Sequence, residues 1–358
     1  MKIIKSKTAN ILKYIPAAAG SCLMAFLLLL MPEKAAEGVR KGLDICAVSV
    51  IPSLFPFMAL SSFLINSRLC LFRGKIANAI GKKLFSLPGS ALSAVFMSLI
   101  GGFPVGASMT SKLLANGEIT KNQAQRMMLF CVNAGPAFVI GTVGVSMLAN
   151  AAAGGIILIS LMISSLSMGF FSFLISDGEF TTPKEYKNEA APEFSQAFTR
   201  SVAHAAGAMF SICAWVILFS CVNAFTDLLS ISESGKIFIK SVLEVTTGSF
   251  AAAGNVSLPI MCLIIGFGGI CVHCQVMGFA AETGIKPSLF IAARIINGAI
   301  AAMVCAIILK FFPISTTVMS NTVQGVPQAY SASIPAAAGL LVMGGLLILE
   351  LDSKRKIC

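Results

Sequence analysis

A short glycine-rich motif offers the clearest site for chemistry in this chain. Gly101-Gly102-Phe103-Pro104-Val105-Gly106 interrupts an apolar segment. Pro104 suits the first position of a helix, because proline lacks the N–H that this position cannot pair. The N–H groups of Val105 and Gly106 would then face the break unpaired, at the positive end of a helix, which is typical of anion sites. We therefore predict an anion-binding tip with Gly102 at its turn.

Three polar residues follow this tip. Ser108, Ser111 and Lys112 stand at i, i+3 and i+4, so they share one face of the predicted helix. Together with the tip, they could hold a small anionic or polar solute. Close packing between helices is the alternative role of the glycines, because small residues serve it throughout membrane proteins.

A second glycine-rich break, Gly268 to His273, lies in the second half of the chain. We take Gly269, His273 and Gln275 as further site residues. The stretch 245–281 around this histidine carries no Asp, Glu, Lys or Arg, and an ionisable residue in such a stretch is a functional candidate. A structural hydrogen bond across helices is the alternative role of His273.

A further break and an arginine complete the candidate site. Asn133 and Gly135 precede Pro136 in an apolar run, where the carboxamide could bind a polar solute or the carbonyls that proline leaves free. Arg294 and Asn297 hold the comparable place in the second half. If Arg294 faces a cavity, it would pair with a carboxylate through two parallel hydrogen bonds. Snorkelling to the lipid interface is its alternative role.

Membrane-spanning helices must position these residues. Of the 358 residues, 56% are hydrophobic and 11% charged, which is typical of polytopic membrane proteins. Segments 88–116 and 252–282 contain the glycine-rich breaks, and we predict that each is a re-entrant helical hairpin, because its halves are too short to span a bilayer. With a cytoplasmic N-terminus, two hairpins also leave more Lys and Arg inside. By apolar length, the predicted spans are 15–31, 45–66, 127–149, 155–176, 204–227, 289–311 and 334–350.

The chain also repeats itself. Pro32-Glu33, followed by Arg40, recurs as Pro192-Glu193, followed by Arg200. Three predicted spans separate the copies, and an odd number inverts the second copy. The predicted fold is therefore an all-α polytopic membrane protein, an inverted repeat of transmembrane helices with two re-entrant helical hairpins. Its parts are an N-terminal signal-anchor helix (1–31), a first repeat (32–176), a hydrophilic linker (177–192), a second repeat (193–350) and a basic tail (351–358).

Composition and motifs narrow the function classes. The net charge of +11 comes from Lys and Arg in short loops between apolar runs, which indicates topology determinants and not nucleic-acid binding. The chain has no Walker loop and no nucleophile–histidine arrangement, so we predict neither direct use of ATP nor an enzyme. We predict no cofactor and no metal, because Cys271 and Cys274 beside His273 cannot surround a metal ion without a second cluster. We interpret the eleven cysteines as reduced packing residues.

Four stretches carry a family resemblance: Gly101 to Lys112, Gly117 to Ile119, Cys131 to Pro136, and Gly268 to Val276. They resemble the YlbJ family of sporulation integral membrane proteins. That family contains the nucleoside-recognition or Gate domain, which is related to concentrative nucleoside transporters and to the membrane part of ferrous-iron transporter B. The resemblance covers residues 35–310. The chain departs from the family pattern at Val105 and Val132, where a small or polar residue is more usual.

The resemblance implies a multi-pass membrane protein of endospore-forming bacteria. It implies a role late in sporulation, linked to moving dipicolinic acid, a pyridine dicarboxylate, across the outer forespore membrane. A planar dianion fits the cations near the tips, so we expect a secondary transporter of a small anionic solute, with dipicolinate as the first candidate. The alternatives are a transporter of a nucleoside-like solute, bound by Asn133, Gln275 and Ser108, and a non-transporting membrane assembly or gating protein. The expected partners are the solute, the lipid bilayer and a coupling ion, H⁺ or Na⁺, and homo-oligomerisation stays open.

Overall fold

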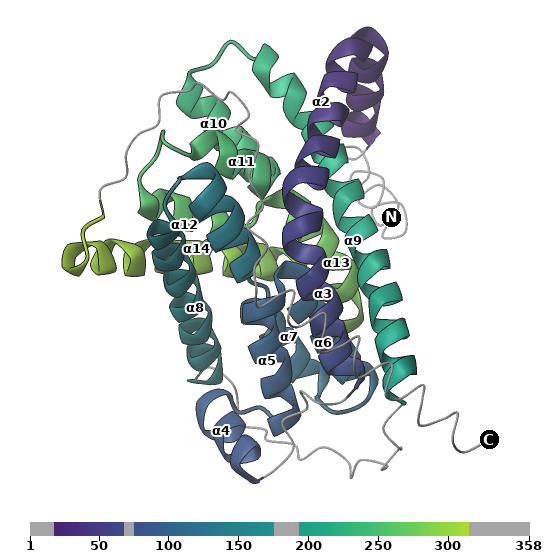
Figure 1. Ribbon diagram of the computed structural model, residues 1–358, viewed down its shortest axis with the longest axis vertical. Coiled ribbons are helices and arrows are strands. Elements are labelled where there is room, and N and C mark those ends of the chain that lie inside the picture. The colour runs from purple at the N-terminus through teal and green to yellow at the C-terminus, as the bar shows by residue number, and fades with distance from the viewer. Residues whose placement is uncertain (1–17, 68–74, 175–192, 315–358) are drawn as a thin grey trace, which may run out of the picture.

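The computed structural model describes residues 18–67, 75–174 and 193–314, where the regular secondary structure is helical and contains no β-strand (Figure 1). In these ranges four helices are long and apolar enough to cross a membrane: Ala151–Ser172, Phe194–Leu228, Leu258–Thr283 and Pro287–Phe311. The number rises to six if each of two bent helix pairs counts as one span. The prediction of an all-α, polytopic membrane protein is confirmed. The linker 177–192, the predicted span 334–350 and the tail 351–358 lie outside the described residues.

The first long element joins three segments end to end: α2 (Pro32–Ile45), the π-helical turn η1 (Cys46–Val50) and α3 (Ile51–Asn66). It packs along α9 (Phe194–Ala224), the helix that begins within the second copy of the sequence repeat (Figure 1). Glycine permits this close approach, since a Cβ on Gly38 would lie 2.7 Å from the Cα of Cys221. The helices that begin the two halves of the chain therefore lie side by side.

The first glycine-rich motif forms a helical hairpin within the predicted segment 88–116. Its two arms are α5 (Gly89–Gly101) and α6 (Phe103–Ala115), with Gly102 between them. Gly102 has φ +88° and ψ 179°, a backbone region open essentially to glycine alone. The arms touch next to the turn, because a Cβ on Gly106 would lie 2.5 Å from the Cβ of Ser98. A short helix, α4 (Lys75–Phe85), precedes this first hairpin and meets α5 at a bend of 71°.

A broken helix follows the first hairpin. It starts with α7 (Lys121–Phe130), which opens with a capping box between Thr120 and Gln123. Residues 131–136 interrupt the helix, and η2 (Ala137–Met147) continues it after Pro136, which lacks the N–H that an unbroken helix would need. Next comes α8 (Ala151–Leu174), which packs against η2. The predicted span at 127–149 is therefore a helix broken near its first third.

The second hairpin lies earlier in the chain than we predicted. Residues 252–282 do not fold back: α12 (Leu258–Phe267) and α13 (Gly269–Thr283) form one apolar element of 26 residues, interrupted at Gly268. The chain reverses instead at Glu244, between α10 (Glu233–Leu243) and α11 (Val245–Ala252), where Gly248 packs directly on the backbone of Ser241. The search for long apolar runs missed this second hairpin, because α10 carries three charged residues.

Both halves thus present the same order of elements. In the first half, α3 is followed by the short helix α4, the first hairpin, the broken helix α7–η2 and the long helix α8. In the second, α9 is followed by the short 3₁₀ turn η3 (Phe225–Leu228), the second hairpin, the broken helix α12–α13 and the long helix α14 (Pro287–Phe311). This order agrees with an internal repeat, but it matches the tip at Gly102 with Glu244 and not with Gly269.

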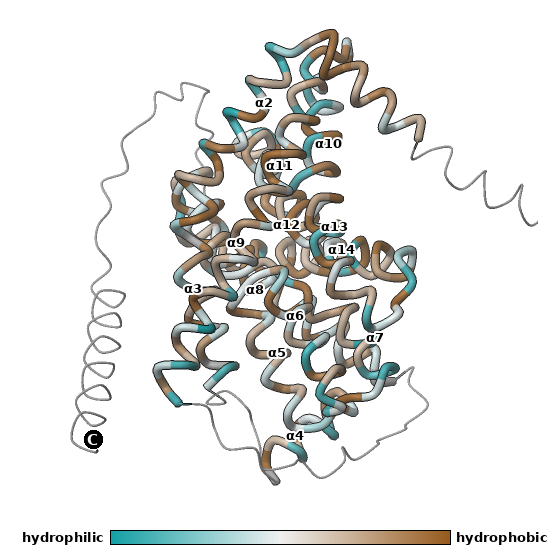
Figure 2. Tube along the Cα trace, turned by 90° about the vertical axis from the view of Figure 1, so that its right-hand side faces the viewer, coloured by the Kyte–Doolittle hydropathy of each residue, from teal (hydrophilic) through white to brown (hydrophobic). Residues whose placement is uncertain are grey.

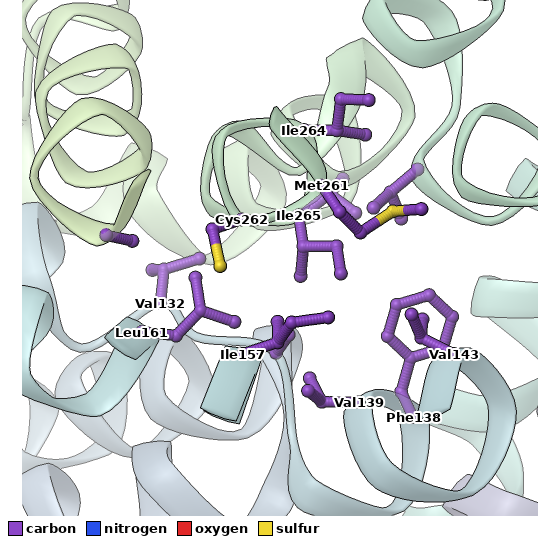
Figure 3. Packing of buried hydrophobic residues seen from close by; sticks show 14 of the residues in the cluster. Val132, Phe138, Val139, Val143, Ile157, Leu161, Met261, Cys262, Ile264 and Ile265 are labelled. Carbon is purple, nitrogen blue, oxygen red and sulfur yellow. The ribbon is translucent and has the colours of Figure 1, made fainter. Parts of the chain in front are cut away.

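A hydrophobic core joins the two broken helices. It includes buried side chains of the break and η2, such as Val132 and Phe138, together with Ile157 and Leu161 of α8. Figure 3 shows Met261, Cys262 and Ile265 of α12 facing them across the core, while Ile264 points away from the other side of the helix. The two breaks are therefore held together by packing that belongs to both halves of the chain.

The outer surface is also apolar. Large hydrophobic side chains are exposed on helices far apart in sequence, with 77% exposure at Phe210 of α9 and 54% at Ile295 of α14. Figure 2 shows many hydrophilic residues near the two ends of the molecule, around α2 and α10 at one end and α4 at the other. This distribution is typical of helices that face lipid along their middle and water at their ends.

The arrangement predicts the sidedness of both hairpins. In Figure 1, α4 and the base of the first hairpin lie at the bottom and α10 lies at the top. In a cysteine-free background, single cysteines at Lys83 and Asn116 should react with an impermeant thiol reagent from one side of the membrane. Cysteines at Glu233 and Asn255 should react from the other side. Labelling of Lys83 and Asn116 from opposite sides would rule out the first re-entrant hairpin.

Candidate functional site

Each hairpin tip touches the break of the broken helix in its own half. A Cβ on Gly135 would lie 3.0 Å from the backbone nitrogen of Gly102, and a Cβ on Gly269 would lie 3.0 Å from that of Val245. Four helices begin at these tips and breaks: α6 at Phe103, η2 at Ala137, α11 at Val245 and α13 at Gly269. The contacts bring their N-terminal ends together near the middle of the molecule. Their N-terminal ends carry partial positive charge.

A small pocket of about 50 Å³ lies between the two tips, and we call it the tip pocket. Both hairpins, both broken helices and the paired helices α3 and α9 contribute to its wall. The polar side chains in the wall are those of Glu244, Thr246 and Gln275. The remaining residues are Val50, Leu54, Met58, Gly101, Gly102, Phe103, Pro104, Gly135, Phe138, Ile212, Val216, Val245 and Val272.

A larger cavity of about 370 Å³ adjoins it, and we call it the lysine cavity. The two spaces share Met58 and Pro104 in their walls. Lys112 of α6 and His204 of α9 are its basic groups, and no Asp or Glu is among the described residues that line it. The others are Ser62, Val105, Ser108, Ala205, Gly207, Ala208, Ser211 and Phe279.

Several predicted site residues therefore come together around these two spaces. Gly102, Pro104, Gly135 and Gln275 line the tip pocket. Pro104, Val105, Ser108 and Lys112 line the lysine cavity. Gly106 and Gly269 serve close packing, because a Cβ on Gly106 would collide with the carbonyl oxygen of Cys131.

Arg294 lies elsewhere and binds main-chain carbonyls. Its guanidinium donates to the carbonyl oxygen of Val132, in the break after α7, and to that of Gly266, at the end of α12. The side chain is 1% exposed and lines neither space. Both carbonyls stand at negative C-terminal helix ends, which favour a cation. Arg294 thus links the two breaks, a role that our sequence-based alternatives did not include.

His273 and Asn133 each bind one of the same two helix ends. The ring nitrogen Nε2 of His273 lies 2.9 Å from the carbonyl oxygen of Phe267, the last residue of α12. The Asn133 carboxamide donates to the carbonyl oxygen of Phe130, the last residue of α7, at 2.9 Å. Each bond satisfies a carbonyl that the break leaves without a helical partner. Asn297 is fully buried on α14, and its carboxamide has no hydrogen-bond partner among the described residues.

Sequence reasoning missed two residues of this region. Glu244 is 1% exposed, lies at the tip of the second hairpin, and accepts hydrogen bonds from the N–H groups of Thr246 and Thr247. Glu is not among the usual N-cap residues, so the local sequence Glu244-Val245-Thr246-Thr247 gave no standard signal for this cap. His204 lies 3.2 Å from Ser62 Oγ, a contact between α9 and α3 that no local pattern predicts.

The chain is similar to a curated protein named sporulation integral membrane protein YlbJ, from Bacillus subtilis (strain 168). The two are 25% identical over 320 residues, which cover 78% of each chain. The similarity supports membership of the YlbJ family. No family model matches the chain, and no solved structure matches it. The YlbJ-like portion is long enough to include both halves of the molecule, so the resemblance extends beyond one motif.

The position of Arg294 generates a prediction about stability. Arg294→Gln should lower the melting temperature of the detergent-solubilised protein, because two buried carbonyls lose their donor at about 1–3 kcal/mol each. Lys310→Gln, at the exposed end of the same helix, should leave the melting temperature unchanged. An unchanged melting temperature combined with lost solute binding would instead indicate that Arg294 binds the solute as a counter-charge.

The tip contacts generate a second prediction. Gly269→Ala should destabilise the protein by about 1–3 kcal/mol, because the residue has φ +76° and its Cβ would press on the backbone of the second hairpin. Gly278→Ala on the same helix is the matched control, since a Cβ there meets nothing within 4 Å. Thermal unfolding of both variants checks this, and equal melting temperatures would contradict the tight tip contact.

Proposed function

We propose that the protein is a secondary transporter that moves a small anionic solute, with dipicolinate as its substrate. The lysine cavity is the observation that carries this proposal. It combines two basic side chains with hydroxyl groups, in a space of about 370 Å³ beside the hairpin tips, and no acidic side chain is among the described residues that line it. Such a lining favours an anion that must leave water to enter the protein.

The chemistry of the cavity suits an aromatic dicarboxylate. Lys112 supplies an ammonium group, and the hydroxyls of Ser108 and Ser211 supply neutral donors for a carboxylate. Met58 and Phe279 offer apolar surface on which a planar ring could pack. His204 of α9, held next to Ser62, adds an imidazole ring to the lining.

The relative adds biological context. Its name describes a sporulation integral membrane protein, and we extend that role to this chain as part of the proposal. We further propose that the protein resides in the outer forespore membrane with a cytoplasmic N-terminus and exports dipicolinate during spore formation. The helix starts around the tip pocket support a transport role, because interrupted helices at membrane depth occur where they line a cavity or are buried in protein.

Uptake into liposomes tests the proposal. Purified protein in liposomes should accumulate labelled dipicolinate, and Lys112→Gln should reduce uptake about tenfold or more, since a hydrogen bond to a charged group contributes about 1.5–3 kcal/mol. Lys83→Gln is the matched control, because Lys83 is exposed on α4 and lies outside both spaces.

Two outcomes would point to the alternatives. Uptake of labelled nucleosides in place of dipicolinate, unaffected by Lys112→Gln, would favour a neutral solute. Absence of uptake for either solute by well-folded protein would favour a non-transporting assembly or gating role.

A further inference from the structure

The lysine cavity is open along α9. His204, Gly207 and Ser211 of this helix line the cavity, and all three residues are exposed. Gly207 leaves open space beside it, since a Cβ there would meet no neighbouring atom within 4 Å. Phe210, between Gly207 and Ser211, is 77% exposed. Because α9 is long and apolar enough to cross a membrane, we expect lipid around this opening.

The basic end of the cavity lies at the depth of lipid headgroups. Lys112 stands nine residues after Phe103, where α6 begins at the first hairpin tip. With a rise of about 1.5 Å per residue, it is about 13 Å from the tip along the helix axis. The hydrocarbon core of a bilayer extends about 15 Å to either side of its midplane. With the tips near the middle of the molecule, the ammonium group therefore lies near the boundary between hydrocarbon and headgroups.

The chemistry of the lining changes with depth in the order that a phospholipid requires. Ser108 is one helical turn deeper than Lys112 on the same face of α6, and it brings a hydroxyl into the cavity. Pro104 and Val105, about a further turn deeper, are apolar, as is Met58 of α3. From the headgroup inward, a glycerophospholipid presents a phosphate, then ester carbonyls, then acyl chains. A cation, a hydroxyl donor and an apolar wall match these three parts in turn.

The ammonium group of Lys112 lacks an anionic partner in the part of the chain that the structure describes. No carboxylate there forms a salt bridge with it, and none lines the lysine cavity. A cation held inside a membrane protein is disfavoured unless it pairs with an anion or reaches water. The opening along α9 gives it access to lipid, so the phosphate of a membrane lipid can be that anion. Basic pockets between transmembrane helices bind anionic headgroups in this way.

We propose that the lysine cavity binds one anionic glycerophospholipid, with its phosphate at Lys112 and its acyl chains leaving through the opening along α9. A volume of about 370 Å³ suits the headgroup and the first carbons of the chains. The rest of the chains would lie against α9, near Phe210, among the bulk lipids. Lipid binding does not depend on the proposed function, but its consequence for transport does. The lipid phosphate and dipicolinate would compete for the same cation, so the solute could bind only after the headgroup has left.

Non-specific attraction of anionic lipid to the protein surface is the competing explanation. Lys83 offers the matched comparison, because it is exposed on α4, at the same end of the molecule as the base of the first hairpin (Figure 1). Surface attraction would weaken equally on loss of Lys83 or Lys112, and salt would screen it. A built site depends instead on Lys112 and on the opening along α9.

Thermal unfolding without solute is the direct test. The purified full-length protein is melted in a neutral detergent with phosphatidylglycerol, with phosphatidylcholine of the same chains, or with soluble glycerol phosphate. Phosphatidylglycerol should raise the melting temperature by at least about 2 °C, because a ligand that binds the folded state stabilises it. Phosphatidylcholine, whose headgroup has no net charge, and glycerol phosphate, which has no chains, should have little effect. An equal shift with either of them, or no shift with phosphatidylglycerol, would overturn the proposal.

Two pairs of variants locate the site. Lys112→Gln should weaken phosphatidylglycerol binding about tenfold or more, whereas Lys83→Gln should bind it as the wild type does. Gly207→Leu should fold, because a Cβ there meets no neighbouring atom, but it fills the opening and should remove the lipid shift. Gly141→Leu on η2, where a Cβ also meets nothing within 4 Å, is its control. Equal weakening by both lysine variants, or full lipid binding by Gly207→Leu, would contradict the proposed site.

Dipicolinate in the same melting experiment separates this proposal from the proposed function. If the protein transports dipicolinate, the solute should reduce the shift that phosphatidylglycerol causes. The lipid shift itself needs no dipicolinate, so failure of the transport proposal would leave it unaffected. A shift with dipicolinate but none with phosphatidylglycerol would overturn the lipid site and support the transport proposal. A lipid shift that dipicolinate leaves unchanged would retain the lipid site and overturn the competition.

Discussion

The fold depends on how the protein supplies hydrogen-bond donors to the carbonyl groups of helices that end in its interior. Helices α5, α7, α10 and α12 all end near the middle of the molecule, and each leaves carbonyls that water cannot reach at membrane depth. Arg294 serves two of these ends at once, His273 serves the end of α12, and Asn133 serves the end of α7. Polar residues that could have been taken for a substrate site are thus largely structural. By bonding these carbonyls, they stabilise the interrupted helices, whose breaks lie beside the tip pocket and the lysine cavity.

Glycine supplies the second requirement, which is close approach. The breaks and tips can touch only where no side chain intervenes, as at Gly135 and Gly269. The long helices use the same device: Gly144 of η2 meets Gly154 of α8, and Gly266 of α12 meets Gly298 of α14. The glycines that interrupt helices and those that pack them therefore act together, and the two explanations of the glycine-rich motifs are not exclusive.

Sequence reasoning could identify the membrane fold, the spans at α8 and α14, and the hairpin turn at Gly102, because apolar length and Gly–Pro chemistry are local signals. It placed the second hairpin wrongly, since Gly268 and Gly269 interrupt a helix without reversing it and the charged α10 does not register as a membrane segment. The partners of Arg294, and the presence of Lys112 and His204 in one cavity, arise between segments distant in the chain. Glu244 was not predicted as a site residue, because it borders the uncharged stretch 245–281 and no local pattern places it at a hairpin turn.

The two hairpins differ in how well their buried hydroxyls are bonded. In the first, Ser98, Thr110 and Ser111 all donate to carbonyl or carboxylate oxygens. In the second, Ser241, Thr247 and Ser249 are buried with no hydrogen-bond partner for their hydroxyls among the described residues. Leaving such a group unbonded disfavours the packed state by about 1–3 kcal/mol, and water would recover that energy on separation. Separation of α10 from α11 would let water bond these three hydroxyls, a gain that the three bonded hydroxyls of the first hairpin do not offer.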